Sequence, residues 1–135
     1  MLRDVFRGMH RFDELSASLG IATNVLALRL KRLTGAGILE RRAYQDRPPR
    51  YEYALTDKGR DLYPVLIAML QWGDRYLRGS DPPPRILIHD TCGKPTHAEL
   101  VCPHCRKEVS ARNARTVSRA EARRAVSARR GRARA

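Results

Sequence analysis

Two short amphipathic segments joined at a single glycine constrain this chain more than any other feature. Apolar residues recur at helical spacing over residues 11–19 and again over residues 23–34. The apolar side chains of the second segment share one stripe: Leu26, Leu30 and Leu33. Gly20 lies between the segments, where a tight corner favours a residue that adopts a left-handed backbone. This pattern predicts a helix-turn-helix, preceded by the end of another helix.

A β-hairpin is predicted directly after the second segment. Strand patterns cover residues 38–43 and 51–55. The connecting residues 44–50 contain two prolines, which cannot donate ladder hydrogen bonds and which stiffen a protruding loop. The same loop carries Arg47 and Arg50. A basic hairpin beside a helix-turn-helix is a wing, so the predicted fold is mainly α with a small antiparallel β wing (α+β).

One long helix is expected after the hairpin, from Thr56 to about Arg78. Thr56 supplies a hydroxyl N-cap, Gly79 supplies the stop, and Pro64 is expected to bend the helix from inside. Its apolar face is too long for a small domain to cover, and Trp and Tyr are favoured interface anchors. The predicted dimerisation residues are Leu62, Val65, Leu66, Met69, Trp72 and Tyr76.

The charge of the chain is strongly positive and unevenly distributed. Among 135 residues, 27 Lys and Arg face 14 Asp and Glu, which gives a formal net charge of +13. Residues 106–135 carry +9 of it, from 11 bases and two acids. Such a surplus indicates a polyanionic partner. The longest apolar run, residues 65–70, is far shorter than the roughly 20 residues of a membrane helix, and no secretion signal is visible. We therefore expect a cytoplasmic protein without a membrane partner.

Four motifs together resemble the HxlR family of winged-helix regulators. They occur in the family's order and spacing, between Met1 and about Leu77, and they are Ile21–Leu33, Gly37–Arg42, Pro48–Tyr53 and Leu55–Arg60. The resemblance implies a homodimer with a recognition helix in the major groove and wings on flanking DNA. Members of the family begin with a further segment that carries a Cys-Pro pair, a first helix and a short strand of the wing sheet. Since this chain begins after that segment, we expect its sheet to lack one strand.

The predicted recognition helix has residues 23–34 and presents DNA-facing side chains opposite the leucine stripe. Asn24 can bond adenine through two atoms, while Ala27 and Leu28 can touch a thymine methyl group. Basic residues further along the helix suit phosphate. Arg29 lies near the buried stripe and fits either a structural ion pair or a DNA contact. The predicted DNA-binding residues are Arg11, Thr23, Asn24, Ala27, Leu28, Lys31, Arg32, Arg47 and Arg50.

The three cysteines lie close together in the last third of the chain. Two pairs of soft ligands, in His89-x-x-Cys92 and Cys102-x-x-Cys105, suggest knuckles joined by a hairpin, with residues 100–101 as its returning strand. Zn²⁺ takes four such ligands in a tetrahedron, so one structural Zn²⁺ per chain is predicted. Its ligands would be His89, Cys92, Cys102 and Cys105, with His97 or His104 as replacements for His89. A small hairpin with reduced thiols and no metal fits the same pattern.

The chain is predicted to have four parts. They are a winged helix-turn-helix and dimerisation domain (1–79), a Pro-rich linker (80–84), a Cys/His hairpin resembling a zinc ribbon (85–110), and a basic tail (111–135). The tail has no core-forming pattern, so we expect it to be disordered or only transiently helical.

These features predict a sequence-specific, double-stranded DNA-binding transcriptional regulator that acts as a homodimer; they name no effector. The alternative is a zinc-ribbon adaptor whose basic tail binds RNA or another protein. An enzyme is not expected, because no Ser-His-Asp set, phosphate loop or paired-carboxylate site is visible. His97-x-Glu99 before the last cysteine pair departs from the zinc deaminase signature, whose two halves begin separate helices.

Overall fold

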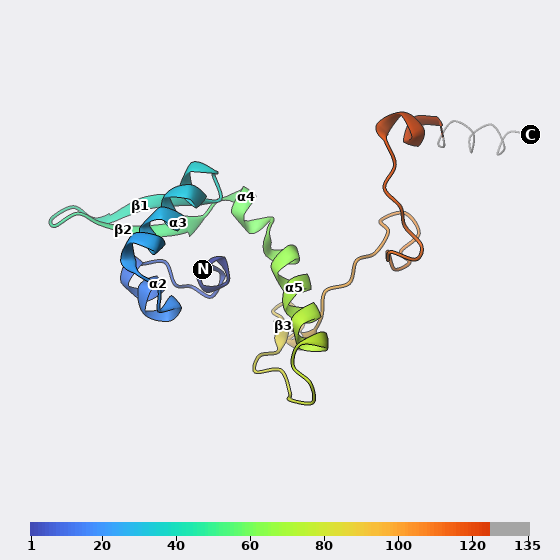
Figure 1. Cartoon of the computed structure of the whole chain (residues 1–135), viewed down its shortest axis with the longest axis horizontal. Coiled ribbons are helices and arrows are strands. Elements are labelled where there is room, and N and C mark those ends of the chain that lie inside the picture. The colour runs from blue at the N-terminus through green and yellow to red at the C-terminus, as the bar shows by residue number, and fades with distance from the viewer. Residues whose placement is uncertain (125–135) are drawn as a thin grey trace, which may run out of the picture. The chain divides into compact units, whose positions relative to one another are not determined.

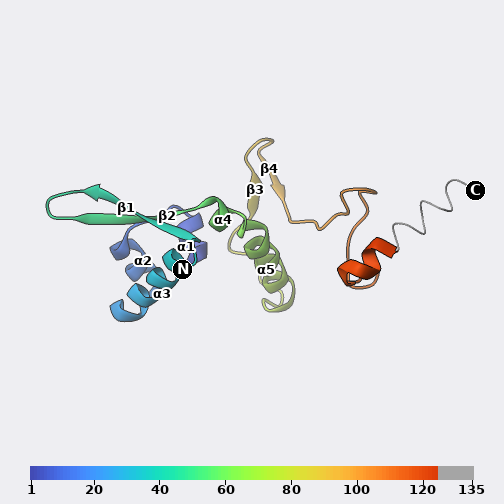
Figure 2. The same cartoon turned by 90° about the horizontal axis from the view of Figure 1, so that it is seen from above.

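The computed structural model describes residues 1–124, and the chain separates into two compact units after Ala98. In the first unit, helices α1 (Leu2–Phe6), α2 (Phe12–Leu19) and α3 (Thr23–Gly35) lie on one face of a β-hairpin (Figures 1 and 2). Helices α2 and α3 begin and end within about one residue of the bounds expected from periodicity, residues 11–19 and 23–34. The predicted mixture of helices with a small antiparallel wing is confirmed.

The core of the first unit lies between these helices and the hairpin. Five side chains that are at most 1% exposed form it: Val5, Leu15, Leu26, Leu30 and Leu39. Burying one leucine fully is worth about 1.5–3 kcal/mol, so these few residues hold the helices to the sheet. Leu33 packs against this core while partly exposed. Gly20 ends α2 with a φ of 58°, so the predicted corner forms in the left-handed region.

The hairpin consists of β1 (Leu39–Gln45) and β2 (Arg50–Leu55), paired antiparallel with Leu39 opposite Leu55. Both strands run further toward the tip than predicted. An irregularity between Ala43 and Gln45 carries the pairing onward, so that Gln45 pairs with Arg50. The predicted loop of residues 44–50 therefore shrinks to 46–49, and Figure 1 shows the hairpin extending beyond the helices.

The sheet of the wing has two strands, in agreement with the expectation that it lacks a strand, but the outer edge of β2 is not bare. Arg11 forms an antiparallel bridge with Glu52, and the Tyr53 N–H donates to His10 O at 2.8 Å. The short segment before α2 thus takes the place of a third strand, over a length of about one residue. The bridge has a simple cause: β2 has an edge that β1 does not pair, and the chain entering α2 runs along it.

Helix α4 (Asp57–Arg60) is fastened to the connection between α3 and β1. Thr56 Oγ1 accepts the Gly59 N–H at 3.0 Å and lies 2.6 Å from Gly37 O, to which it donates. Lys58 Nζ donates to Ala36 O at 2.8 Å. A Cβ placed on Gly59 would lie 2.1 Å from Ile38 O, so only glycine lets the two backbones approach this closely.

The predicted long helix is two helices, α4 and α5 (Tyr63–Tyr76), separated at residues 61–62. Pro64 does not bend a continuous helix; it stands in the first turn of α5, where a missing N–H costs no hydrogen bond. None of the α5 residues is fully buried. Among the described residues, no helix is long and apolar enough to cross a membrane.

A second hairpin, β3 (Leu87–His89) paired with β4 (Lys94–Thr96), belongs to the first unit. The Ala98 N–H donates to Gln71 Oε1 on α5 at 3.1 Å. The prediction that residues 100–101 form the returning strand of this hairpin is therefore wrong. The strand that pairs with β3 is β4, which lies earlier in the chain.

In the second unit, Val101 forms a bridge with Glu108, and the Val109 N–H donates to Leu100 O at 2.7 Å. This small hairpin encloses the last cysteine pair. A helical turn over residues 119–124 follows, within the predicted basic tail. The rest of that tail, residues 125–135, lies outside the described residues.

Candidate nucleic-acid interface

Helix α3 divides sharply between a buried side and an exposed side. Leu26 and Leu30 are at most 1% exposed, whereas Leu28 is 49% exposed. The remaining predicted contact residues of this helix are also exposed: Thr23, Asn24, Ala27, Lys31 and Arg32. The helix therefore presents a continuous polar and basic surface with one leucine in it.

Asn24 lies in the first turn of α3, and its Oδ1 accepts the Val25 N–H at 2.9 Å. An adenine contact through both amide atoms would require the side chain to exchange this local hydrogen bond. The exchange needs a rotation about side-chain bonds and no movement of the backbone.

For Arg29, the sequence is compatible with two roles, a structural ion pair or a DNA contact. Its side chain is exposed, and it forms no ion pair with any residue in the described part of the chain. Its guanidinium therefore adds to the positive surface of α3.

The wing carries the predicted Arg47 and Arg50 at its exposed end. Gln45 Nε2 donates to Arg47 O at 2.9 Å, which fastens the tip to the end of β1. Arg47 thus lies in a short, braced turn, and Arg50 follows as the first residue of β2.

Two arginine–tyrosine stacks on this surface were not predicted as site residues. The Arg11 guanidinium lies 4.6 Å from the Tyr44 ring centroid, and that of Arg41 lies 3.4 Å from the Tyr51 centroid. Ala43 pairs with Tyr51, so Arg41 and Tyr51 are diagonal neighbours across the strands. The strand register would have revealed this second pair, whereas the Arg11 stack depends on the tertiary fold.

A carboxylate fixes the turn that positions Arg11. Glu14 Oε2 accepts the N–H groups of His10 and Arg11, each at 3.0 Å. The Arg11 backbone hydrogen bond, followed by that of His10, lowers the pKa of Glu14 below its ordinary value. Glu14 thus closes the N-terminus of α2 in the manner of a capping box.

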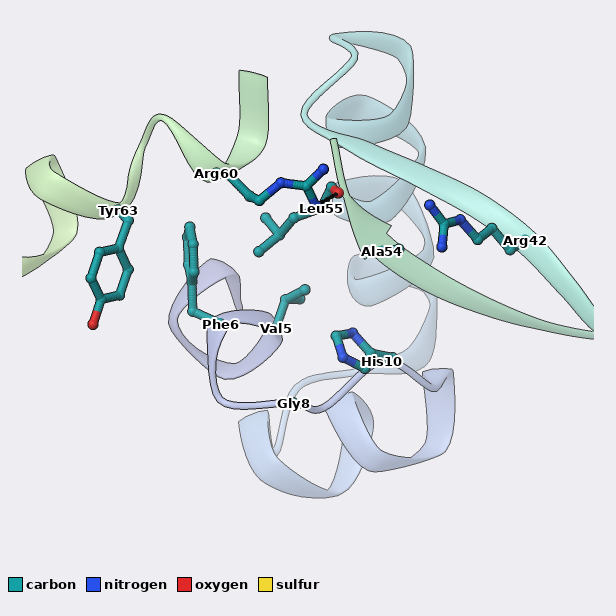
Figure 3. A pocket seen from close by; sticks show the side chains of 9 residues that line it. All are labelled: Val5, Phe6, Gly8, His10, Arg42, Ala54, Leu55, Arg60 and Tyr63. Atoms are coloured by element: carbon teal, nitrogen blue, oxygen red, sulfur yellow. Dashed lines mark hydrogen bonds between the residues drawn. The ribbon is translucent and has the colours of Figure 1, made fainter. Parts of the chain in front are cut away.

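An open cavity of about 480 Å³ lies between α1, β2 and the start of α5 (Figure 3). Val5, Phe6 and Leu55 meet at its centre. Two of its polar groups have partners within the chain: Arg60 donates to Leu55 O at 2.7 Å, and His10 Nδ1 lies 3.2 Å from Tyr53 O. These two polar groups of the lining are therefore engaged within the chain.

Four of the six predicted dimerisation residues lie on one exposed face of α5. Met69, Trp72 and Tyr76 are 65%, 56% and 60% exposed, and Val65 is 54% exposed. The other two, Leu62 and Leu66, are partly buried. Trp72 and Tyr76 lie against each other with ring centroids 5.8 Å apart.

The predicted metal ligands fall into two local pairs. His89 and Cys92 lie at the β3–β4 turn of the first unit, whereas Cys102 and Cys105 lie in the second unit. Within residues 1–124, no three or more His, Cys, Asp or Glu side chains gather closely enough to hold a metal ion. The four-ligand zinc set therefore stays a prediction.

Comparison with known proteins matches this architecture to transcriptional regulators. The HTH-type transcriptional regulator Rv3095 of Mycobacterium tuberculosis is 42% identical over 113 residues, which span 84% of this chain and 72% of the relative. The crystal structure of PA1607, a candidate transcription factor, superposes with a TM-score of 0.77 at 36% identity, covering 87% of this chain and 82% of that one.

A second solved structure, the candidate transcription factor PA1374 from Pseudomonas aeruginosa, gives a TM-score of 0.65 at 35% identity. It covers 91% of this chain and 87% of its own. The family model of the HxlR-like helix-turn-helix matches residues 1–81. The chain therefore belongs to the HxlR-like helix-turn-helix family of transcriptional regulators.

Proposed function

We propose that this regulator binds double-stranded DNA sequence-specifically as a homodimer, with α3 in the major groove and the wing against the neighbouring backbone. The observation that carries the proposal is the two-sided character of α3. Leu26 and Leu30 fix the helix to the core, while the opposite side carries Leu28 among polar and basic residues. A leucine that is half exposed on a basic surface suits contact with a thymine methyl group.

The two halves of the α3 surface would have different roles. Recognition helices read base edges mainly with their N-terminal part, where Asn24 and Leu28 lie. Lys31 and Arg32 follow, and they suit phosphates, which position a protein without carrying sequence information. Exposed Arg29 adds positive charge to the same helix.

The arginines of the wing surface would hold the flanking backbone. Stacking on Tyr44 and Tyr51 restricts the guanidiniums of Arg11 and Arg41, so less side-chain freedom is lost when they bind phosphate. Arg47 and Arg50 extend the basic surface to the tip. Residues 106–135 carry a formal charge of +9 and would add sequence-independent attraction.

The homodimer is supported by the face of α5 formed by Val65, Met69, Trp72 and Tyr76. These side chains are more than half exposed, and large exposed apolar patches mark interaction sites. Two copies joined there would present two α3 helices. Half-sites of a helix-turn-helix dimer lie about one DNA turn apart, or a multiple of it, so we expect an inverted repeat as the operator.

The test is a titration of the full chain with three labelled nucleic acids over a range of salt concentrations. These are the duplex from upstream of its own coding sequence, a random duplex of equal length, and single-stranded RNA of equal length. We expect the upstream duplex to bind most tightly. Preference for RNA would contradict the proposal and favour an adaptor, and equal binding of both duplexes would exclude sequence reading.

Two variants of α3 separate base reading from phosphate binding. Asn24→Ala should weaken upstream-duplex binding by about 1–3 kcal/mol and leave random-duplex binding nearly unchanged. Lys31→Ala should weaken both duplexes alike and reduce the salt dependence. Equal losses on both duplexes for Asn24→Ala would remove that residue from the base-reading set.

A further inference from the structure

A groove of about 410 Å³ lies between α1, α5 and the start of β3, all within the first unit. Its apolar lining comes from all three elements, with Phe6 on α1, Ile67 and Leu70 on α5, and Leu87 on β3. We call it the α1–α5 groove. Its volume falls within the range of small-molecule sites, which are mostly apolar with a few polar groups that fix the ligand.

Two contacts hold the walls of the α1–α5 groove together. The ring centroids of Phe6 and Tyr63 lie 5.1 Å apart, with the rings tilted by 49°, and this pair joins α1 to α5 (Figure 3). The Ala98 N–H donates to Gln71 Oε1 at 3.1 Å, which joins the segment after β4 to α5. Phe6 and Tyr63 both line the groove, and aromatic walls suit a flat ring, because rings gain from edge-to-face and offset contacts.

The ionised side chains of the groove are all positive. Three arginines line it, and none of the described lining residues is acidic: Arg3, Arg7 and Arg85. Arg3 and Arg7 share a single carboxylate, because Asp4 Oδ1 lies 2.8 Å from the guanidinium of Arg3 and 3.7 Å from that of Arg7. One positive charge of this pair is therefore left without a counter-charge.

Arg85 forms no ion pair with any residue that the structure describes. Asp74 lines a neighbouring hollow together with Arg85, but its carboxylate lies 3.7 Å from the guanidinium of Arg78, with which it pairs. A guanidinium binds a carboxylate through two parallel hydrogen bonds. An anion with a large apolar body would fill the groove and neutralise Arg85, whereas a small hydrated anion would leave the apolar walls uncovered.

We propose that the α1–α5 groove binds a small aromatic carboxylic acid, with its ring against Phe6 and Leu70 and its carboxylate at Arg85. The site is formed by one chain, so ligand binding does not require the proposed dimer. Leu66 and Met69, which are proposed for dimerisation, also line the groove. A bound acid would therefore contact both α1 and the proposed dimer face, and the regulator would sense the acid through this contact, a consequence that rests on the proposed function.

Isothermal titration calorimetry of the full chain with 2-naphthoate measures the binding. The matched probes are 2-naphthalenemethanol, which has the same rings without the charge, and acetate, which has the charge without the rings. Naphthoate should bind at least about tenfold more tightly than the alcohol, since hydrogen bonds between charged groups are the stronger class, and acetate should not bind measurably. Equal affinities for naphthoate and the alcohol would overturn the proposal.

The titration is run at two protein concentrations, one at which light scattering gives the mass of a monomer and one at the highest attainable concentration. Binding of naphthoate at either concentration supports the site. Its absence at both would overturn the proposal and would make the groove part of the face that a second copy covers.

Two pairs of variants at exposed positions locate the site. Arg85→Met should reduce the preference for naphthoate over the alcohol by about tenfold, whereas Arg47→Met at the wing tip should leave it unchanged. Ile86 lines the groove and is 66% exposed, so Ile86→Glu should repel the acid and abolish binding. Ile88→Glu is its control, because Ile88 is 46% exposed and lies outside the lining. Full binding by both Arg85→Met and Ile86→Glu would place the ligand elsewhere.

Methyl chemical shifts of the wild-type chain locate the ligand without any substitution. The rings of naphthoate should shift the methyl signals of Ile67, Leu70 and Leu87, and should leave those of Leu26 and Leu39 in the core unchanged. Shifts that spare the three groove residues would contradict the proposal.

The sensing role is tested by titrating the upstream duplex with and without naphthoate. The affinity for this duplex should change by about fivefold or more, the usual range for coupled sites. Unchanged affinity despite calorimetric binding would overturn the sensing role. A chain that binds naphthoate but no duplex under any condition would count against the proposed function and leave the ligand site in place.

Discussion

The winged-helix body (residues 1–55, with α1–α3 and the β1–β2 hairpin) and helix α5 both contain many apolar residues. The body buries them, whereas α5 exposes them. In the body, Leu15, Leu26 and Leu30 are at most 1% exposed and join three helices to one hairpin. In α5 no side chain is fully buried, and Met69 is 65% exposed. The body is therefore stable through contacts within the chain, whereas α5 leaves an apolar face exposed, which the proposed dimer would cover.

The largest effect that would test this difference is expected within α3 itself. Leu30→Ala removes a buried side chain and should lower the free energy of unfolding by about 2–5 kcal/mol. Leu28→Ala, two residues away and 49% exposed, should change it by less than about 0.5 kcal/mol. Urea denaturation at fixed protein concentration measures both. Similar losses for the two variants would show that the division between the faces of α3 is wrong.

For α5 the prediction concerns association. Trp72→Asp places a charge on the exposed apolar face and should weaken dimerisation by about 2–4 kcal/mol, because aromatic anchors dominate such interfaces. The measurement is mass by light scattering over a dilution series. Ile88→Asp is the control. Ile88 is an exposed apolar residue of β3 and lies outside the exposed face of α5. A wild-type chain that stays monomeric at high concentration would leave α5 without the proposed partner.

A smaller effect is expected where the body is fastened to α4. A Cβ on Gly59 would lie 2.1 Å from Ile38 O, so Gly59→Ala must separate the two backbones. Its cost should be about 1–3 kcal/mol in the free energy of unfolding. Gly35→Ala, with nothing within 4 Å of its added Cβ, should instead raise stability by up to about 1 kcal/mol. If Gly59→Ala were equally benign, α4 would not be held as closely as the structure shows.

The same contrast explains what could be predicted from the sequence. The leucine stripe of α3 is a local pattern with a helical period, and Gly20 marks a local corner, so both could be located from residues alone. The break at residues 61–62 could not be located, because the apolar pattern continues across it. Pro64 is compatible with either an interior bend or a first-turn position.

The remaining differences depend on residues that are distant in the sequence. Arg11 pairs with Glu52 as a single bridge, which leaves no alternating pattern to detect. The stack of Arg11 on Tyr44 requires that same tertiary contact. The His89/Cys92 and Cys102/Cys105 pairs were visible as residue types, but their separation into two compact units is a property of the tertiary fold.

The smallest predicted effect is a pH dependence at the start of α2, inside the body. Glu14 Oε2 accepts two backbone N–H groups at 3.0 Å, and these lower its pKa below the ordinary value of 4.5. A lowered pKa in the folded state means that the contribution to stability is fully present above the unfolded pKa. It is lost as the pH falls through the folded pKa.

Glu14→Gln removes this titration while keeping the shape of the side chain. The wild type should be more stable than the variant near neutral pH, and the difference should shrink as the pH falls below about 4.5. Denaturant unfolding at several pH values and one protein concentration measures it, with Asp46→Asn at the exposed wing tip as the control substitution. A difference that stays constant across this range would show that the carboxylate charge does not hold the turn. Hydrogen bonds to a side-chain oxygen, which glutamine also provides, would then account for the turn without the charge.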